Sequence, residues 1–173
     1  MPEYDHRNDK GAGLGRVHFI GAGPGDPGLL TLKAQQLIQQ ADLVLYAGSL
    51  VNPAILQHVR PETLLYSSAR MALSEQIALM QQVTERGGSV ARLHTGDPSI
   101  FGDIFEQMRA LDQLGVAYDV VPGVSSAMAA AAALGIELTI PDLTQTIVFS
   151  RVSGRTPVPS REELPALAAL RCS

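Results

Sequence analysis

The stretch Gly21-Ala22-Gly23-Pro24-Gly25-Asp26-Pro27-Gly28 decides the fold. It stands between a short apolar run at 17–20 and a helical pattern that reaches Gln40. A strand that ends in a glycine-rich loop and continues into a helix is the unit from which α/β proteins build ligand sites. The sequence therefore predicts an α/β protein whose first loop belongs to a binding site.

Two nucleotide-binding patterns fit this loop only in part. Its glycines have the spacing of a dinucleotide fingerprint, but Pro24 and Pro27 have no N–H to donate to a pyrophosphate. The next strand-like run, 43–46, continues into Ala47 instead of ending in the acid that binds a ribose. A triphosphate loop would need Lys-Ser/Thr where Leu29-Leu30 stands. We therefore expect neither nucleotide.

The composition limits the class of protein. A length of 173 residues fits one domain, and 46% hydrophobic residues are enough for a core. The net charge is −4 and the basic residues are scattered, so we expect no nucleic-acid partner. No apolar run is long enough to span a membrane, and the polar N-terminus predicts no signal peptide. One cysteine, Cys172, indicates a reducing compartment, and we expect a cytoplasmic protein.

Strand-like runs and helical patterns alternate along the chain. The expected strands are 17–20, 43–46, 63–66, 90–94, 116–121 and 146–150, and the expected helices are 31–40, 54–58, 74–86, 103–114 and 125–134. This order predicts a parallel sheet with helices on both faces, in a domain that spans 16–150. Residues 1–15 are predicted to be a disordered tail. We expect residues 151–173 to be a connector and the start of a truncated second domain.

Three glycine-containing loops are expected at one edge of this sheet, because the carboxyl ends of parallel strands meet at one edge and ligands bind there. They are 21–28, 95–102 and 122–127, and they are nearly uncharged. Such loops let a ligand approach the backbone closely. Asp26 and Asp97 each precede a proline, which is also the signal for a helix N-cap, so capping and ligand binding both stay open.

Residue types that carry acid, base or metal chemistry are sparse. The sequence has no His/Cys cluster with metal spacing and no legible Ser-His-Asp arrangement, and we expect no metal. The histidines stand alone in the sequence. His94 ends a strand just before the second loop, but a structural role is the better explanation for a lone histidine. This pattern fits catalysis in which positioning of the reactants provides most of the rate.

Three stretches together resemble the signatures of the tetrapyrrole methylase family, namely 17–27, Thr-Gly-Asp-Pro-Ser-Ile-Phe-Gly at 95–102 and Val-Pro-Gly-Val-Ser-Ser-Ala at 121–127. The stretches 46–51, 138–146 and 154–159 resemble the branch that methylates precorrin-4 or cobalt-precorrin-4 at ring carbon C11. The resemblance runs from about Val17 to Glu163. It implies the N-terminal α/β domain of a two-domain enzyme that uses S-adenosylmethionine in cobalamin and porphyrin biosynthesis, with the second domain missing.

The resemblance also implies which residues line the site. Cofactor binding is expected of Pro24, Gly96, Asp97, Ile100, Ser125, Ser126 and Ala127. Tetrapyrrole binding is expected of Gly23, Gly25, Asp26, Tyr46, Ser49, Ser67 and Ser68, with Arg70 and Arg155 as further partners for its carboxylates. Asp97 is the one candidate for a catalytic base, although binding or capping explains it better, and Tyr46 could equally be a core residue.

The implied reaction is a direct displacement, in which a ring carbon of the tetrapyrrole attacks a sulfonium methyl group in line. Two alternatives stay open. One is an inactive half-enzyme that at most binds a tetrapyrrole, and the other is a family methylase that acts at a different ring carbon. The family also implies a homodimer.

Overall fold

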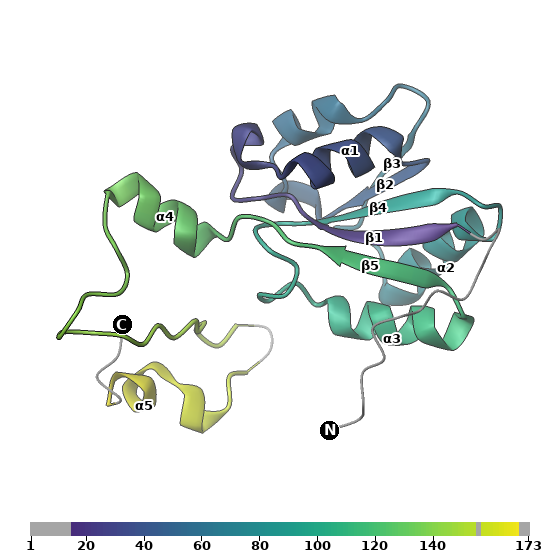
Figure 1. Cartoon of the computed structure of the whole chain (residues 1–173). Coiled ribbons are helices and arrows are strands. Elements are labelled where there is room, and N and C mark those ends of the chain that lie inside the picture. Colours follow the sequence, from purple (N-terminus) through teal and green to yellow (C-terminus); the bar gives the residue numbers. More distant parts are fainter. Residues whose placement is uncertain (1–14, 155–156, 170–173) are drawn as a thin grey trace. The chain divides into compact units, whose positions relative to one another are not determined.

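The computed structural model describes residues 15–154 and 157–169, and the chain divides into two compact units, Met1–Ala129 and Ala130–Ser173. The first unit is a five-stranded parallel sheet flanked by helices (Figure 1). The predicted α/β class, with a parallel sheet and helices on both faces, is confirmed. Of the tail predicted at 1–15, residues 1–14 lie outside the described residues, as do Arg155 and Cys172. Gly15 is buried and its N–H donates to the carbonyl of Thr84 at 2.8 Å, so the ordered domain begins one residue earlier than predicted.

The elements follow the predicted order. The strands are β1 (Arg16–Gly21), β2 (Leu43–Tyr46), β3 (Leu64–Ser67), β4 (Ser89–His94) and β5 (Ala117–Val121). The α-helices are α1 (Leu32–Gln40), α2 (Leu73–Thr84), α3 (Ile104–Leu114), α4 (Ser126–Leu134) and α5 (Leu164–Ala168). Short 3-10 segments are η1 (Pro27–Leu29), η2 (Gly48–Leu50), η3 (Pro53–His58) and η4 (Ser160–Glu162). None of the described helices has the length and apolar character needed to cross a membrane.

The helix ends are set by local sequence. Thr31 precedes α1, and its hydroxyl accepts a hydrogen bond from the backbone N–H of Ala34 at 3.1 Å. Glu75 in the first turn of α2 accepts one from the N–H of Ala72 at 2.6 Å. Gly115 ends α3 with a φ of 68°, a left-handed conformation that glycine adopts without steric cost.

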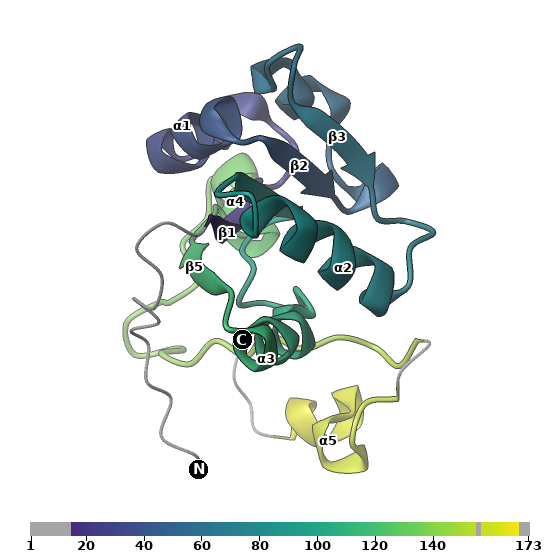
Figure 2. The same ribbon diagram turned by 90° about the vertical axis from the view of Figure 1, so that its right-hand side faces the viewer.

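The strands lie in the order β3-β2-β4-β1-β5. Alternate side chains of the sheet point to opposite faces, which gives two cores. Ile20 and Val44 pack with Ile38 of α1 on one face. On the other face, Phe19 packs with residues of α2 and α3, among them Met80 and Leu111. Figure 2, a view turned toward the ends of the strands, shows α1 on one side of the sheet and α2 and α3 on the other.

The topology places a switch point at the carboxyl end of β4. The chain leaves β1 and β2 toward the face that carries α1 and η3, whereas it leaves β4 toward α3 on the opposite face. Because β4 lies between β2 and β1, neighbouring connections diverge on both sides of its end. In open α/β sheets, ligands bind at such a point.

The prediction of a strand at 146–150 is wrong. These residues belong to the second unit and form neither helix nor strand there. Ile147, Val148 and Phe149 are at least 36% exposed. Their apolar, β-branched sequence is typical of a strand, but a strand also needs a neighbour whose backbone it can pair with. The bridge that the second unit shows among its described residues joins Ile140 to Thr144.

Candidate functional site

The first and second loops are joined by their backbones at the carboxyl edge of the sheet. The N–H of Gly96 donates to the carbonyl of Gly23 at 2.8 Å, and the N–H of Gly23 donates to the carbonyl of Gly96 at 3.3 Å. Just below, the N–H of Ala22 donates to the carbonyl of His94 at 2.7 Å. Residues more than seventy positions apart in the sequence therefore form one wall, because β1 and β4 are neighbours.

Asp97 links the second loop to the third. One carboxylate oxygen accepts from the N–H of Gly123 at 3.0 Å, and the other accepts from the N–H of Ser99 at 2.8 Å and from the Ser99 hydroxyl. Partial burial raises the pKa of Asp97, but these hydrogen bonds outweigh it and hold the pKa below its usual value. An ionised carboxylate that already accepts three hydrogen bonds is a weak base, and here it links the second loop firmly to the third.

Asp26 and Asp97 differ in whether they cap a helical segment. Asp26 caps the 3-10 segment η1, because its carboxylate accepts from the N–H of Gly28 at 2.8 Å. After Asp97 the chain makes a turn rather than a helix, and α3 begins only at Ile104. The Asp-Pro signal is local in both loops, but at Asp97 the nearby third loop provides an additional donor.

Glycines allow the three loops to approach this closely. A Cβ added to Gly123 would lie 2.2 Å from the carbonyl oxygen of Gly96 and 2.7 Å from the Cα of Gly21. A Cβ on Gly21 would lie 2.5 Å from the Cα of Gly123. Backbone atoms cannot move aside as a flexible side chain can, so a larger residue at either position would separate the loops. These glycines serve the joining of loops.

Gly25 has a different environment. Its φ is +122°, and no atom lies within 4 Å of the position that a Cβ would take. The carbonyl of Gly25 accepts a hydrogen bond from the side-chain amide of Asn52 at 2.6 Å, and the Asn52 carbonyl oxygen accepts from the N–H of Ala54 at 3.0 Å. Asn52 thus ties the first loop to the segment after β2. Asn52 was not among the predicted site residues, although Asn followed by Pro53 is a helix-start signal.

The residues expected on the tetrapyrrole side lie at the ends of β2 and β3. Tyr46 is partly buried against the core on the α1 face, and its carbonyl accepts hydrogen bonds from the N–H and the hydroxyl of Ser68, at 2.9 and 3.1 Å. Ser67 and Arg70 are exposed at the same edge, and Ser49 lies in η2. The structure therefore brings these residues to the predicted edge, on the opposite side of β4 from the third loop.

The third loop leads into the first turn of α4. Ser126 begins the helix, and the hydroxyl of Ser125 accepts a 3.4 Å hydrogen bond from the N–H of Ala127. The N-terminal end of a helix carries a partial positive charge, so this turn favours an anionic group of a ligand.

Backbone strain is concentrated in the second loop. Phe101 has a φ of 54° and Asp103 a φ of 51°, values that residues other than glycine rarely adopt. Between them, a Cβ on Gly102 would lie 2.1 Å from the carbonyl oxygen of Pro98, so the turn is folded tightly on itself. Phe101 is 59% exposed. Strained backbone gathers at functional sites, and no local sequence signal points to it here.

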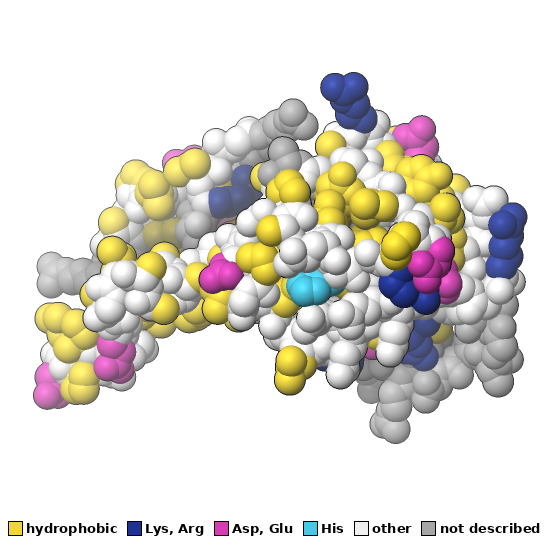
Figure 3. Space-filling view, turned by 90° about the horizontal axis from the view of Figure 1, so that it is seen from above, with side chains coloured by type: hydrophobic (Ala, Val, Ile, Leu, Met, Phe, Trp, Pro, Cys, Tyr) yellow, Lys and Arg dark blue, Asp and Glu magenta, His cyan; other side chains and the backbone are white. Residues whose placement is uncertain are grey.

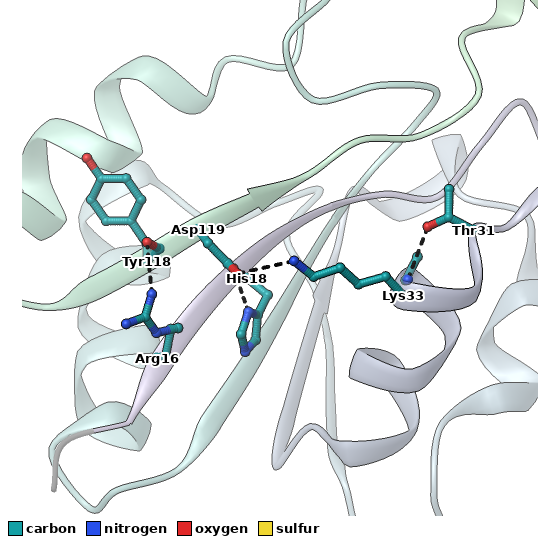
Figure 4. A network of polar contacts seen from close by, with 7 residues as sticks. Arg16, His18, Thr31, Lys33, Tyr118 and Asp119 are labelled. Atoms are coloured by element: carbon teal, nitrogen blue, oxygen red, sulfur yellow. Dashed lines mark hydrogen bonds and ion pairs between the residues drawn. The ribbon is translucent and has the colours of Figure 1, made fainter. Parts of the chain in front are cut away.

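A second polar group lies at mid-strand on the α1 face (Figure 4). The Nδ1 of His18 on β1 lies 2.5 Å from the carboxylate of Asp119 on β5, and the Nζ of Lys33 on α1 lies 3.8 Å from it. Burial raises the pKa of Asp119, but the hydrogen bond from His18 and the nearby cations lower it overall. His18 therefore has a partner that its isolated position in the sequence did not reveal. This cluster is away from the loop edge.

The face that carries α1 has few charged side chains (Figure 3). Figure 3, seen from above the face that carries α1, shows mainly uncharged and hydrophobic atoms with a few charged side chains between them. Among the described residues, no three His, Cys, Asp or Glu side chains come together as metal ligands. The joined loops therefore offer a ligand mostly backbone groups, hydroxyls and small side chains.

The fold defines a class of protein, a parallel α/β domain with three glycine-containing loops gathered at the switch point of its sheet. The sequence matches the family described as Tetrapyrrole (Corrin/Porphyrin) Methylases over residues 16–171. The chain belongs to the tetrapyrrole methylase family, as its three loop signatures predicted.

Individual relatives narrow the comparison. A cobalt-precorrin-4 C(11)-methyltransferase from Methanocaldococcus jannaschii is 47% identical over 153 residues, which are 88% of this chain and 59% of the relative. The X-ray structure of a cobalt precorrin-4 methyltransferase matches with a TM-score of 0.87 and 49% identity, over 91% of this chain and 66% of that one. This chain therefore spans less than two thirds of the length of either.

A more distant solved structure contains a ligand. Uroporphyrin-III C-methyltransferase from Thermus thermophilus, complexed with S-adenosyl homocysteine, matches with a TM-score of 0.61 and 37% identity. The match covers 76% of this chain and 53% of that chain.

Proposed function

We propose that this chain takes part in the S-adenosylmethionine-dependent methylation of precorrin-4, or cobalt-precorrin-4, at C11 in cobalamin biosynthesis. The observation that carries the proposal is the junction of the three signature loops through Gly23, Gly96, Asp97 and Gly123. The names of the two relatives that are 47% and 49% identical support the reaction and the ring position.

The residues at this edge fit the cofactor. S-adenosylmethionine presents a carboxylate, an ammonium group, ribose hydroxyls and an adenine, all of which can bond to backbone or hydroxyl groups. The first turn of α4, at Ser125 to Ala127, suits the carboxylate, and the open space at Gly25 leaves room beside Pro24. Gly96 and Ile100 would contact the cofactor from the second loop. When bound, the cofactor supplies an electrophilic methyl group.

The residues of the chain act mainly by positioning. Methyl transfer of this kind requires an aligned carbon nucleophile and exclusion of water more than proton transfer. Asp97 keeps the second and third loops together rather than moving a proton, because three hydrogen bonds occupy its carboxylate and lower its pKa. We assign to no other residue the role of base for the proton that finally leaves the substrate.

The tetrapyrrole would bind beside the first loop and the ends of β2 and β3. Gly23, Gly25 and Asp26 form the loop side of this region, and Tyr46, Ser49, Ser67 and Ser68 form the strand side. Arg70 is exposed just after β3, and it would bind a substrate carboxylate there. The substrate carries several carboxylates, whereas this edge has few charged side chains. We therefore expect the shape of the site to determine which ring carbon is methylated.

Isothermal titration calorimetry of the 173-residue chain with S-adenosylhomocysteine tests the cofactor part. We expect saturable one-to-one binding, with no heat from ATP or NAD under the same conditions. No detectable binding of S-adenosylhomocysteine would contradict the proposal and favour a half-enzyme that does not use the cofactor. A methylation assay with labelled S-adenosylmethionine and both forms of precorrin-4 then tests the substrate.

The position of the new methyl group distinguishes the main proposal from a second candidate function. The 37% identity with a uroporphyrin-III C-methyltransferase favours a family enzyme that acts at another ring carbon. NMR of the labelled product locates the methyl carbon directly. A methyl group at C11 supports the main proposal, and one at any other carbon supports the second candidate.

We further propose a cytoplasmic homodimer. Several large apolar side chains of the second unit are exposed, including Leu134 at 71% and Leu143 at 75%. Exposed apolar surface favours association. Sedimentation equilibrium would show a mass of twice 18.4 kDa if the chain dimerises, whereas a single species of 18.4 kDa would contradict this.

A further inference from the structure

Asn52 follows η2 and is held in place by its neighbours in the chain. Val51 is 2% exposed and Ile55 is fully buried, and both belong to the core on the α1 face. Between them, Asn52 is the N-cap of η3, and its side-chain carbonyl oxygen accepts from the N–H of Ala54 at 3.0 Å. A backbone N–H can only donate, so this bond also fixes which way the planar amide of Asn52 faces.

The other end of that amide holds the crest of the first loop, residues 24–25. The side-chain N–H of Asn52 donates to the carbonyl of Gly25 at 2.6 Å, across 27 positions of sequence. On one side of the crest, Gly23 is bonded to the second loop, and on the other side Asp26 caps η1. Among the described residues, no other hydrogen bond holds the backbone of Pro24 or Gly25. The position of the crest therefore depends on Asn52.

The crest needs such a bond because its own sequence does not fix it. Gly25 has a φ of +122°, and no atom lies within 4 Å of the position that a Cβ would take. Glycine has more conformational freedom than any other residue. Pro24 has no N–H with which to bond to the neighbouring backbone. The bond from Asn52 therefore replaces the contacts that side chains and backbone amides provide elsewhere in the site.

Capping of η3 alone does not account for an asparagine at this position. Serine, threonine and aspartate cap helices about as well as asparagine does. In this chain Thr31 caps α1 and Asp26 caps η1. None of these side chains combines a carbonyl acceptor and an N–H donor on one short amide. Two simultaneous bonds, one to Ala54 and one to Gly25, explain the asparagine.

We infer that Asn52 is a positioning residue for cofactor binding, because its side-chain amide ties the crest of the first loop to the segment after β2. This role rests on the proposed function, in which Pro24 lies beside the cofactor and Ser49 lies on the tetrapyrrole side. Methyl transfer requires the two ligands to be aligned, and a tie between the segments that bind them sets that alignment. Asn52 acts through the first loop and does not touch the reacting atoms.

The substitution Asn52→Asp separates the tie from the cap. It keeps the size of the side chain and the oxygen that accepts from Ala54, but it replaces the N–H by a second oxygen. At pH 7 the carboxylate repels the Gly25 carbonyl, and in calorimetry we expect S-adenosylhomocysteine to bind at least about tenfold more weakly than to the wild type. At pH 4 about half of these carboxyl groups are protonated and can donate an O–H to Gly25. The affinity should then return to within about threefold of the wild type at the same pH.

The matched control is Gln36→Glu, which makes the same change from amide to acid at an exposed position of α1. It should bind S-adenosylhomocysteine as the wild type does at both pH values. Equal affinity of Asn52→Asp and wild type at pH 7 would overturn the positioning role. A loss of affinity that persists at pH 4 would overturn it too, because acid restores the donor but does not repair a damaged fold.

Nuclear magnetic relaxation of the ligand-free protein tests the tie without the cofactor. At pH 7, the order parameters of the Gly25 and Asp26 amides should fall from about 0.85 in the wild type to below about 0.6 in Asn52→Asp. The amides of 54–58 and of β1 should keep their wild-type values, since the cap and the sheet are intact. Unchanged order parameters at Gly25 and Asp26 would overturn the tie itself. If the wild type binds no S-adenosylhomocysteine, the proposed function fails and the role of Asn52 in binding fails with it.

Discussion

Asp97 shows how one residue can hold a site together without reacting. Its carboxylate connects the second loop to Gly123 of the third, 26 positions away. It also fixes Ser99 within its own loop. A residue of this kind affects ligand affinity through the arrangement of backbone groups that other loops contribute.

We predict that Asp97→Ala lowers the free energy of unfolding by about 1–3 kcal/mol, because the N–H groups of Ser99 and Gly123 lose an acceptor. We also expect S-adenosylhomocysteine to bind at least about tenfold more weakly, because the two loops are no longer held together. Denaturant unfolding and calorimetry measure the two effects. Asp26→Ala is the control, because Asp26 caps only η1. It should lower the free energy of unfolding by about 1 kcal/mol. Equal effects of both substitutions would contradict the linking role of Asp97.

The pKa of His94 is lowered by burial and by the charge of Arg92, and it predicts how the free energy of unfolding depends on pH. Its pKa is about 3 in the folded chain and 6.5 for an unperturbed histidine, so below pH 6.5 the unfolded chain binds a proton that the folded chain does not. The free energy of unfolding should therefore fall as the pH is lowered, by up to about 1.4 kcal/mol per pH unit from this group. In denaturant titrations between pH 7 and 4.5, wild type should lose stability relative to His94→Phe. A constant difference between the two proteins over this range would count against the lowered pKa.

At the scale of elements, the site depends on which strands are neighbours in the sheet. Gly21 ends β1, Gly123 follows β5 and Gly96 follows β4. The backbones of Gly21 and Gly123 lie too close to each other, and to the Gly96 carbonyl, for a side chain at either of these two positions. Below this edge, Arg92 on β4 reaches β2, α2 and α3 through three hydrogen bonds, to Leu45, Gln76 and Gln107.

We predict that Gly123→Ala costs more than about 2 kcal/mol of unfolding free energy and abolishes S-adenosylhomocysteine binding, since its Cβ would lie 2.2 Å from the Gly96 carbonyl oxygen. Gly154→Ala is the control, because no atom lies within 4 Å of its Cβ position. Thermal unfolding and calorimetry of both variants test this. Normal binding by Gly123→Ala would show that the loops can separate without loss of the site.

Arg92→Met should lower the free energy of unfolding by about 2–4 kcal/mol, because it leaves the oxygens of Gln76 and Gln107 without their donor in a buried place. Arg109→Met, on the exposed side of α3, should change stability by less than about 0.5 kcal/mol. Urea unfolding of the two variants measures the difference. A similar small effect for both would mean that the buried cation contributes little to holding the four elements together.

For the whole molecule, the two compact units differ in how their backbones are satisfied. The first has β1 and β4 at the centre of the sheet, each paired on both sides. In the second, the described elements other than the end of α4 are the short segments η4 and α5. Strand pairing on both sides gives slow exchange, and short segments give fast exchange.

Hydrogen exchange followed by mass spectrometry should therefore show the amides of β1 and β4 exchanging at least about 100-fold more slowly than those of 136–154. The expected order is central strands, then the edge strands β3 and β5, then the second unit. Equal protection of 136–154 and β4 would contradict this division of stability.

Much of this molecule followed from local sequence. The alternation of apolar runs and helical patterns predicted five of the six expected strands and the four α-helices of at least nine residues within a residue or two, because period and caps are local properties. The cap at Asp26 and the family signatures of the three loops were equally local. The common edge of the loops followed from the rule that parallel strands end together.

Only the tertiary structure decided which loops touch. The order β3-β2-β4-β1-β5 places the ends of β1, β4 and β5 side by side, and chain order alone does not give this arrangement. The bond from Gly123 to Asp97, the tie from Asn52 to Gly25 and the burial of His94 above Arg92 all depend on it. The strand expected at 146–150 failed for the same physical reason, since pairing partners are set by the arrangement of the whole chain and not by the segment itself.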